Sequence, residues 1–450
     1  MAHAPLRQPP ASGLRPAARL RWQGLLCLLD ALALLALPLL PLLSALRRAR
    51  RGSGIPGLQE KVLGPCASRD LPRGGVVVHG VSLGEVGLMN LVVPALEQSW
   101  GGPCVLTTST ATGMQALNQR WRQQPQAWWP LDVPMAVDGF LDRLRPRAVV
   151  LLELELWPRF LAACHRRGIP VYVVNGRVSA RSYAGYRRLG GVIRPLLRPL
   201  ALALGQNAEW SARLRALGCQ RVCIGGSLKA DLVRLASETA VDELRSRLNL
   251  DPQRPLLVIA STSDDEEQVC LAAWRQACPD WQLVICPRHP ERGARVSEMV
   301  AALGASPWRW SLAASPPSAQ AVRIVDTIGQ LSALYALADM AIVGGSLGSN
   351  RHGQNMLEAA AHGCATVVGM DTSNFPDAMA LLRTAEAVVE TTAEDLAATL
   401  ARLAADPAWR QRLAAHGRCA WLGARGALAR SQRLLAAHAP APRINDKSLE

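Results

Sequence analysis

Short apolar runs alternate with helix-length segments along most of this chain, and that alternation limits the fold more than any other feature. From Gly75 onward, six runs of strand length each precede a longer segment of mixed polarity. In order they are VVVHGVS, PCVLTTST, AVVLLELEL, PVYVVNGR, LALALGQ and RVCIGGS. Strands that alternate with helices pair into parallel sheets through right-handed crossovers. The first half is therefore predicted to be an α/β domain.

A second series of the same kind begins near Arg254 and predicts a second α/β domain. Its runs are PLLVIAST, WQLVICPRHP, AVRIVDT, MAIVGGS and CATVVGM, and Ala- and Leu-rich helical sequence follows them. Helical sequence rich in Ala, Ser, Glu and Arg separates the two series at residues 232–253. At about 150 residues per domain, 450 residues suit two or three domains. We expect two similar halves, residues 52–240 and 241–435, with a cleft between them and a flexible tail at 436–450.

The first 51 residues lack this alternation. Residues 1–23 contain several arginines and five Pro or Gly interruptions without apolar periodicity, and they predict a disordered basic tail. Residues 24–46 are leucine-rich, interrupted by Asp30 and two prolines, and four arginines follow within residues 47–51. About 20 apolar residues can span a bilayer, but the Asp and the prolines equally suit a segment that lies in the membrane interface. Basic residues stand where a signal peptide would have its small-residue cleavage site, so residues 24–51 are predicted to be a membrane anchor.

The charge of the chain is strongly positive and almost entirely due to arginine. Lys and Arg number 50 against 35 Asp and Glu, a net charge of +15, and only three residues are lysines. Arginine favours forked contacts with phosphate and carboxylate, so nucleic acid, anionic lipid and phosphorylated substrates are candidate partners. A genomic base composition that favours arginine codons explains the bias equally well. No basic patch interleaved with aromatic residues is present, which disfavours nucleic acid.

The cysteines set the expected compartment. The chain has 11 of them, scattered without a CxxC pair and without a cluster of histidines near them. This pattern predicts neither a disulfide framework nor a zinc site. The folded part is therefore expected to be cytosolic.

Ligands of open parallel sheets bind beyond the carboxyl ends of the strands, so the residues after each run are the functional candidates. After the first run, two glycines and a serine precede Glu85, whose simplest interpretation from spacing is a first-turn carboxylate stabilised by the helix dipole. After the third run, strand alternation places Glu153 and Glu155 on one face at the end of a buried strand. Burying carboxylates without partners costs several kcal/mol, which favours a function for at least one over a structural ion pair. Lys229 is either selected for its compact ammonium group or a chance surface lysine.

The second half offers groups that suit a phosphate. Arg288 follows one run in the sequence CPRHP, and Gly345 and Ser346 follow another. The sequence GQNMLEAA then begins a helix whose N-terminal N–H groups favour an anion, and Glu358 within it is placed to accept ribose hydroxyls. The chain has no Walker lysine motif and no GxGxxG. These residues predict nucleotide binding, but neither an ATPase nor a dehydrogenase.

Taken together, these motifs resemble the 3-deoxy-D-manno-octulosonic acid (Kdo) transferase family, whose members move Kdo from CMP-Kdo to a lipid A precursor. The resemblance runs from about Gly75 to Leu382, most of the folded chain. It rests on HGVSLGEV, TTSTATG, PLDVPMAVDGFLDRLRP, ELELWP, NGRVSARS, GGSLKAD, PRHPER, DTIGQLSALYALADMAIVGGS and GQNMLEAA. Linked motifs in the family's order are far more specific than any one of them.

The resemblance implies the GT-B architecture, in which two Rossmann-like parallel-sheet domains face each other across a cleft, here with an N-terminal membrane-associated helix. It implies that the amino-terminal domain binds the lipid acceptor and the carboxy-terminal domain binds the CMP-sugar donor. The activity it implies is an inverting transfer of Kdo to the phosphorylated precursor lipid IVA in lipopolysaccharide core synthesis, with no metal and no cofactor beyond the donor. The expected location is the cytoplasmic side of the cell inner membrane.

The resemblance also implies roles for particular residues. Glu85 corresponds to the family's catalytic base, and Glu153 and Lys229 correspond to residues linked to transition-state stabilisation. The positions that correspond to CMP contacts are Pro287, Arg288, Ile328, Gly329, Gln330, Asn355 and Glu358. The argument from the residues themselves adds Gly345 and Ser346 to this set.

The chain departs from the family pattern at several positions. The family commonly has His where Gln354 stands, MGE where Ile328, Gly329 and Gln330 stand, and NPLEP in place of NMLEA. Its STHxGEE is STSDDEE here, so Ser263 replaces a His. Two alternatives therefore stay open. One is a transferase for another activated sugar, and the other is a catalytically lapsed protein that binds nucleotide or lipid.

Overall fold

The computed structural model describes residues 37–51, 54–65, 71–312, 317–348 and 351–440, together with Gly24, Asp30, Ala31 and Leu35. The predicted tails at 1–23 and 441–450, and most of the predicted anchor before residue 37, lie outside the described residues. No helix among the described residues is long and apolar enough to cross a bilayer. Cysteines in these ranges are all free thiols.

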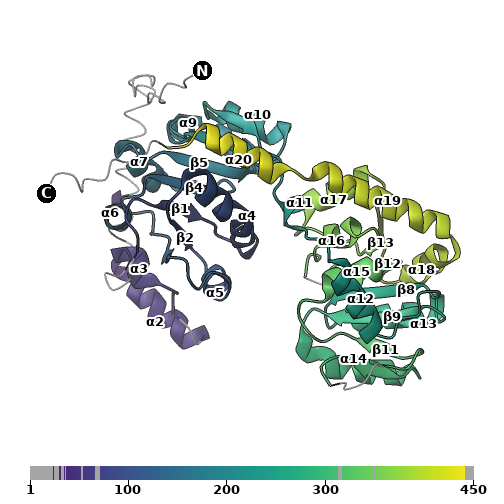
Figure 1. Cartoon of the computed structure of the whole chain (residues 1–450). Coiled ribbons are helices and arrows are strands. Elements are labelled where there is room, and N and C mark those ends of the chain that lie inside the picture. Colours follow the sequence, from purple (N-terminus) through teal and green to yellow (C-terminus); the bar gives the residue numbers. More distant parts are fainter. Residues whose placement is uncertain are drawn as a thin grey trace. The chain divides into compact units, whose positions relative to one another are not determined.

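The chain divides into two compact units (Figure 1). The first contains the chain up to Leu232 and the segment that begins at Gly426, and the second contains Val233–Arg425. The boundary therefore lies eight residues before the expected break between 240 and 241, and the C-terminal helix belongs to the first unit rather than to the second.

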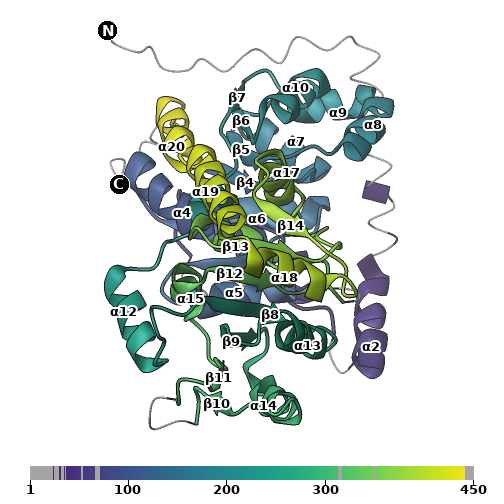
Figure 2. The same cartoon turned by 90° about the vertical axis from the view of Figure 1, so that its right-hand side faces the viewer.

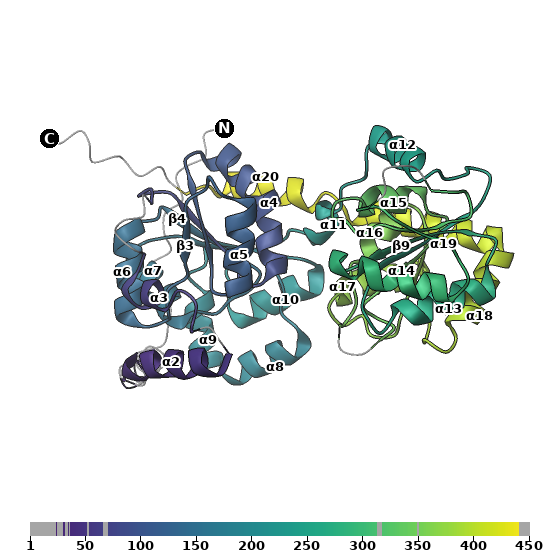
Figure 3. The ribbon, with the colours of Figure 1, turned by 90° about the horizontal axis from the view of Figure 1, so that it is seen from below.

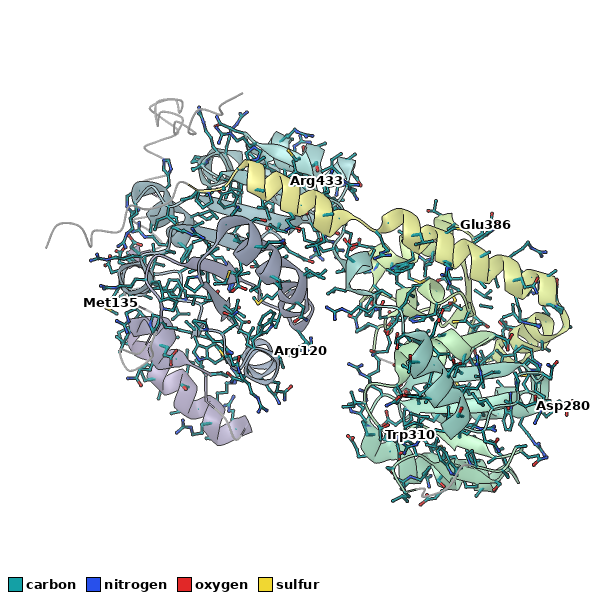
Figure 4. The ribbon with its side chains drawn as sticks, viewed as in Figure 1. Arg120, Met135, Asp280, Trp310, Glu386 and Arg433 are labelled. Atoms are coloured by element: carbon teal, nitrogen blue, oxygen red, sulfur yellow. The ribbon has the colours of Figure 1, made fainter. Side chains whose placement is uncertain are left out.

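The C-terminal helix joins the first unit because its apolar face is buried there. Helix α20 (Ala427–Ala437) lies beside α4 (Leu83–Trp100) (Figure 1). Leu435 of α20 is buried, and its carbonyl accepts a hydrogen bond of 3.0 Å from the Trp100 indole. Arg433, labelled in Figure 4, is exposed on the same helix. The helix is therefore amphipathic and covers the sheet of the first unit.

The first unit is built on a seven-stranded parallel sheet in the order β3-β2-β1-β4-β5-β6-β7. The strands are β1 (Val76–His79), β2 (Cys104–Thr108), β3 (Gln126–Trp128), β4 (Ala148–Leu152), β5 (Val171–Gly176), β6 (Leu202–Gly205) and β7 (Val222–Ile224). Figure 2 shows β4 to β7 side by side. The central strands are buried on both faces, which is why they appear in the sequence as continuous apolar runs.

Helices cover both faces of this sheet (Figure 3). One face is covered by α4, α5 (Ala111–Arg120) and α20, and the other by α6 (Pro134–Leu144), α7 (Pro158–Arg166), α9 (Gly190–Leu197) and α10 (Ala208–Leu217). The remaining helices of this unit are the 3-10 turn Leu37–Leu39, α2 (Leu40–Arg51), α3 (Leu58–Leu63), α8 (Ala180–Arg188) and α11 (Lys229–Leu232).

The second unit repeats the same architecture with the strand order β10-β11-β9-β8-β12-β13-β14, all parallel. Its strands are β8 (Leu256–Thr262), β9 (Gln282–Pro287), β10 (Pro307–Arg309), β11 (Val322–Ile324), β12 (Met340–Val343), β13 (Ala365–Val368) and β14 (Val388–Glu390). The prediction of two parallel α/β halves is confirmed.

Helices of the second unit also lie on both faces of its sheet (Figure 3). One face is covered by α13 (Glu267–Ala277), α14 (Gly293–Ala302) and α18 (Leu396–Ala405), and the other by α15 (Leu331–Leu337) and α16 (Met356–Ala361). The remaining helices are α12 (Glu238–Arg247), a 3-10 turn at Pro290–Arg292, α17 (Pro376–Thr384) and α19 (Pro407–Ala424).

Candidate functional site

The topology of the first sheet places two of the predicted catalytic residues at neighbouring strand ends. Strands β1 and β4 pair directly, and the chain leaves β1 on one side of the sheet before it returns through β4 on the other. Such a reversal of strand order is the topological switch point at which open α/β sheets bind ligands. Glu85 lies in the first turn of α4, directly after β1, and Glu153 is the first residue after β4.

Hydrogen bonds from the preceding loop fix the Glu85 carboxylate. Its Oε2 accepts from the Val81 N–H at 2.6 Å, and its Oε1 accepts from the Ser82 hydroxyl at 2.9 Å. Ser82 also caps α4, because its Oγ accepts from the Glu85 N–H at 3.2 Å. The residue is only 9 % exposed. A carboxylate accepts about four hydrogen bonds, so each oxygen retains acceptor capacity for a substrate hydroxyl.

Gly80 is needed for this arrangement because the loop passes very close to α4. A Cβ at Gly80 would lie 3.1 Å from the Glu85 Cβ and 3.2 Å from the Met89 Cε. The backbone of the HGVSLGE motif at Gly80 therefore packs directly against Glu85. This close approach explains one of the two glycines that precede Glu85 in the sequence.

Two threonines, Thr108 at the end of β2 and Thr110 directly before α5, hold the same loop from the other side. Thr110 Oγ1 donates to the Val81 carbonyl at 2.7 Å, and Thr108 Oγ1 donates to the same carbonyl at 3.2 Å. Thr110 Oγ1 also accepts from the Gly113 N–H at 3.1 Å and so caps α5. The TTSTATG motif therefore anchors Val81, whose N–H in turn positions the Glu85 carboxylate. We name this set of contacts the threonine clamp.

Glu153 adopts a left-handed backbone conformation that ends β4. Its φ is 63°, and its N–H donates to the Val174 carbonyl at 2.9 Å. A residue other than glycine in this conformation stores about 1–3 kcal/mol of strain, as is common at functional sites. The prediction that Glu153 and Glu155 extend one face of the strand is wrong, because β4 ends at Leu152 and both residues lie in the loop after it.

The loop after β4 is instead held by its apolar residues. Leu154, Leu156 and Trp157 pack against the core beneath α6 and α7. The Asp132 carboxylate fixes the end of the loop, because its oxygens accept from the Arg159 and Phe160 N–H groups at 3.0 and 2.8 Å, at the start of α7. Glu153 and Glu155 are only partly buried.

The three carboxylates are close enough for their charges to interact. Burial, together with the negative charges of Glu85 and Glu153, raises the pKa of Glu155 to about 7. Burial and the charge of Glu155 also raise the pKa of Tyr186 on α8. Glu155 therefore lies within electrostatic range of Glu85, Glu153 and Tyr186, although these residues come from three separate segments of the chain. The sequence did not single out Tyr186.

An aromatic cluster lies next to this site, at the end of β1. His79, the last residue of β1, is fully buried and stacks on Trp129 with ring centroids 3.8 Å apart, and Trp157 meets it edge-on at 6.4 Å. Burial lowers the pKa of His79 to about 3, so its imidazole is neutral and is not a proton carrier at physiological pH. Trp157 ties the loop that carries Glu153 and Glu155 to the end of β1.

Lys229 follows the loop after β7, at the same end of the first sheet. It is the first residue of α11. The N–H of Leu228 donates to the Asn175 side chain at the end of β5, at 3.0 Å, and so anchors this loop beside the strand ends. Lys229 is partly buried.

The raised pKa of Glu155 predicts that the stability of the first unit depends on pH. A carboxyl group with a folded pKa of about 7 and an ordinary value of 4.5 binds a proton more tightly when folded, so its contribution to stability is lost as pH rises between these values. Each pH unit in that interval contributes at most about 1.4 kcal/mol, and the partial exposure of Glu155 reduces this.

We expect the urea midpoint of wild type to fall from pH 5 to pH 8 by more than that of Glu155→Gln. Glu209→Gln, at an exposed carboxylate of the same unit, should follow wild type, and equal slopes in all three proteins would contradict the assignment.

The second unit brings most of the predicted nucleotide-binding residues to the carboxyl ends of its strands. Pro287 is the last residue of β9, and the exposed Arg288 follows it, with its N–H donating to the Thr262 carbonyl at the end of β8 at 3.0 Å. After β11 come Ile328, which is 88 % exposed, Gly329, whose φ is 105°, and Gln330, which directly precedes α15.

The loop after β12 pairs with the segment that leads into α16. The Gly353 N–H donates to the Gly345 carbonyl at 2.6 Å, and the Gln354 N–H donates to the Gly344 carbonyl at 3.1 Å. Gly345 has a φ of 78°, and a Cβ there would lie 3.1 Å from Gln354 Cγ, so this crossing strongly favours glycine. The structure therefore places Gly345 and Ser346 beside Gln354 and the next residue, Asn355.

Asn355 and Glu358 lie at the start of α16. Asn355 is the residue before the first helical position, and its side chain makes no capping hydrogen bond in the described structure. Burial raises the pKa of Glu358, which lies in the first turn. Within the described ranges, no group of three His, Cys, Asp or Glu side chains is placed to hold a metal ion.

Glu266 is a functional candidate that the sequence argument did not single out. It is fully buried after β8, and its carboxylate accepts hydrogen bonds from the N–H groups of Gly345 and Ser346 at 2.6 and 2.9 Å. These two N–H groups are therefore directed at a carboxylate of the protein itself. The signal for this residue was the Ser-x-x-Glu spacing of Ser263 and Glu266, which is typical of a helix start.

Comparisons with known proteins agree with the motifs. A family model described as 3-deoxy-D-manno-octulosonic-acid transferase matches residues 48–232. The chain is 36 % identical over 370 residues to the 3-deoxy-D-manno-octulosonic acid transferase of Bordetella pertussis, covering 78 % of this chain and 83 % of that one. It is 30 % identical over 374 residues to the enzyme of the same name from Haemophilus influenzae, covering 81 % and 86 %.

A solved structure supports the fold. UDP-GlcNAc 2-epimerase from Neisseria meningitidis, bound to UDP-GlcNAc, matches with a TM-score of 0.51 at 12 % identity, covering 81 % of this chain and 98 % of that one. At this identity the likeness concerns the two-sheet fold alone.

Proposed function

Because this chain belongs to the 3-deoxy-D-manno-octulosonic acid transferase family and is a glycosyltransferase, we propose that it transfers Kdo with inversion from CMP-Kdo to a phosphorylated lipid A precursor. The observation that supports this most is the Glu85 carboxylate at the switch point of the first sheet. It is buried, held on both oxygens by single donors, and close enough to Glu155 for their charges to interact. This is the environment expected of a positioned general base.

In the proposed reaction, Glu85 takes the proton of the acceptor hydroxyl as that oxygen forms its bond to the anomeric carbon of Kdo. The bond between that carbon and the phosphate oxygen of CMP breaks at the same centre, so the configuration inverts. Lys229 and Glu153 contribute charge at the end of the first sheet that stabilises the transition state. No metal or other cofactor takes part in this proposal.

The second unit binds the donor in this proposal. Arg288 supplies an exposed guanidinium that can hold the phosphate of CMP through a forked contact. Pro287, Ile328, Gly329 and Gln330 border the nucleotide. Asn355 and Glu358 form hydrogen bonds with the ribose hydroxyls. The partly buried carboxyl group of Glu358 suits hydroxyl partners.

A direct transfer assay tests the proposed function. Detergent-solubilised protein is incubated with CMP-Kdo, generated in place, and tetraacylated lipid A precursor, and the lipid product is weighed by mass spectrometry. We expect product with added Kdo. Activity with a UDP-sugar and none with CMP-Kdo would show that the chain transfers another sugar, and binding of CMP without any transfer would show a lapsed enzyme.

Helix α2 is proposed to contact the membrane, on the cytoplasmic side of the inner membrane where the acceptor lies. Leu42, Leu43 and Leu46 are 59, 51 and 47 % exposed, and the basic residues of the same helix directly follow them. Exposed leucines beside arginines suit binding to anionic lipid surfaces. The double variant L42E/L46E should lower the fraction that floats with anionic vesicles. Leu63→Glu, at another exposed leucine, is the control, and unchanged flotation of the double variant would contradict the proposal.

The threonine clamp gives a prediction about rate. Thr110→Val removes the hydroxyl that holds Val81 and caps α5, so Glu85 loses its exact placement. We expect kcat to fall about tenfold, since a misplacement of about 1 Å costs up to 10²-fold, and stability to fall by about 1 kcal/mol from the lost cap. Steady-state kinetics and thermal unfolding measure the two effects.

Two further variants separate the clamp from general damage to α5. Thr110→Ser keeps the hydroxyl and should recover most of kcat. Thr112→Val changes an exposed threonine of the same helix that is not among the threonines bonded to Val81, and it should behave as wild type. Equal kcat in Thr110→Val and wild type would show that the clamp does not position Glu85.

A further inference from the structure

Glu266 lies at the switch point of the second sheet. Strands β8 and β12 pair directly, and the chain moves from β8 to β9 on one side before it returns through β12 on the other. The loops after these two strands therefore border the place where open α/β sheets bind ligands. Glu266 comes from the loop after β8, and Gly345, Ser346 and Leu347 form the loop after β12.

Five donors surround the Glu266 carboxylate. Its Oε1 accepts from the N–H groups of Ser346 at 2.9 Å and Leu347 at 2.8 Å. Its Oε2 accepts from the Gly345 N–H at 2.6 Å and from the Ser263 N–H at 2.9 Å. The Ser263 hydroxyl lies 2.8 Å from the same oxygen and shares its one proton with the Asp265 carboxylate at 2.6 Å. The Glu266 side chain is fully buried. Successive backbone N–H groups that converge in this way form an anion-binding nest, which we call the β12 nest.

The β12 nest is rigid, so it cannot easily offer its donors to a second anion. Ser346 Oγ donates to the Val343 carbonyl at 3.1 Å and accepts from the Gly369 N–H at 2.8 Å. A Cβ on Gly369 would lie 2.0 Å from the Ser346 carbonyl oxygen, and a Cβ on Gly344 would lie 2.7 Å from Thr262 Cα. Neighbouring strands thus hold the loop on both sides, and the Glu266 carboxylate completes it.

The nest adjoins the residues proposed to bind the donor. The loop that forms it also binds the backbone of Gly353 and Gln354, directly before Asn355. A phosphate chain that extended from a nucleoside at Asn355 and Glu358 toward the switch point would meet a carboxylate, not free N–H groups. The negative charge of Glu266 and the loss of its hydrogen bonds both oppose its displacement by phosphate.

We propose that Glu266 is a specificity-determining residue that fills the phosphate-binding nest of the second unit and so selects nucleoside monophosphate sugars over nucleoside diphosphate sugars. This inference rests on the proposed function, because it assumes that the second unit binds the nucleotide. CMP carries one phosphate, which the proposed Arg288 contact satisfies outside the nest. A second phosphate that reaches the nest finds its N–H groups already bonded to Glu266 and gains no affinity from them.

The experiment compares CMP and CDP binding by titration calorimetry in the full chain. Wild type should bind CDP no more than threefold tighter than CMP. Glu266→Ala frees the four N–H groups, and we expect it to favour CDP over CMP by at least tenfold. Asp264→Ala removes an exposed charge two residues away and should keep the wild-type ratio. A wild-type preference for CDP of tenfold or more overturns the proposal, as does an unchanged ratio in folded Glu266→Ala.

A second measurement keeps the inference separate from the proposed function. Inorganic phosphate should raise the thermal midpoint of Glu266→Ala and leave that of wild type unchanged, whichever nucleotide the protein uses. Should Glu266→Ala not fold, the wild-type CDP-to-CMP ratio and the phosphate response of the shorter Glu266→Asp decide the matter. If the protein does not transfer Kdo but the CDP-to-CMP ratios and the phosphate responses are as expected, only the proposed function is refuted. Absence of any phosphate response in a folded variant would refute the inference alone.

Discussion

Replacing Glu85 by Gln is expected to lower kcat by about 10²–10⁴-fold, the usual contribution of a positioned general base. The amide is nearly the same size as the carboxylate and can still accept from the Val81 N–H, which donates to Glu85 at 2.6 Å. It cannot take a proton from the acceptor hydroxyl. CMP affinity should stay within about twofold of wild type, because the proposed nucleotide contacts all come from the second unit. Single-turnover transfer and CMP titration measure the two quantities.

Glu97→Gln is the matched control for this experiment. Glu97 lies on the same helix, α4, twelve residues further along, which at about 1.5 Å per residue places it about 18 Å from Glu85. Its carboxylate accepts a hydrogen bond from Gln124 and takes no part in the site. Glu97→Gln should transfer at the wild-type rate. Wild-type transfer by Glu85→Gln would remove Glu85 from the role of base and direct attention to Glu155, whose pKa of about 7 also suits proton transfer.

The central strands could be predicted from the sequence because both faces of each parallel sheet are covered. All eleven predicted runs form strands, including β4, which is buried at every position. The strands that the sequence did not predict are β3, β10 and β14, each of three residues at a sheet edge. A short edge strand needs no continuous apolar run, because only one neighbour pairs with it. Its position is set by the rest of the sheet.

Assignment of the C-terminal helix failed for a related reason. α20 follows the second unit in sequence, and nothing in its amphipathic pattern says which sheet it covers. The Trp100 hydrogen bond to Leu435 joins residues 335 positions apart. Contacts of that kind are fixed by tertiary packing, so a reading of neighbouring residues could not place the domain boundary.

The candidate site could be predicted only in part. Parallel topology was enough to bring Glu85 and Glu153 to neighbouring strand ends. The left-handed turn at Glu153 was not predictable, because it depends on the loop packing through Leu154, Leu156 and Trp157. Nor could the approach of Tyr186 to Glu155, from a separate helix, be foreseen.

Glu266 illustrates a local pattern whose meaning only the structure reveals. Ser82 and Glu85 have the same Ser-x-x-Glu spacing after β1 as Ser263 and Glu266 have after β8. In the first unit the glutamate retains acceptor capacity, whereas in the second it is surrounded by five donors. Spacing alone predicts a helix start in both cases. The difference comes from the β12 loop, which lies about 80 residues further along the chain.

Removing Arg292 is expected to have the largest effect on stability. Its guanidinium donates to both oxygens of Glu267, with Nε at 2.9 and 3.1 Å and an Nη at 2.7 Å. Glu267 is fully buried, whereas Arg292 is about one quarter exposed. Breaking a buried pair leaves an uncompensated charge and costs about 3–5 kcal/mol. We expect Arg292→Ala to lower the free energy of unfolding of the second unit by about 3 kcal/mol, at the lower end because of this exposure, in urea titrations at pH 7.

The physical cause of that loss can be tested with two further proteins. Arg295→Ala breaks an exposed pair with Glu298 only three residues away and should cost less than about 1 kcal/mol. The double variant Arg292→Met with Glu267→Leu removes both charges and should recover most of the loss, because no buried carboxylate is then left unpaired. Failure to recover would assign the cost to lost packing of the arginine stem instead.

Arg292 ends the turn that follows Arg288, so Arg292→Ala should also weaken CMP binding. The double variant shows whether that loss of affinity comes from the charge or from the position of the loop.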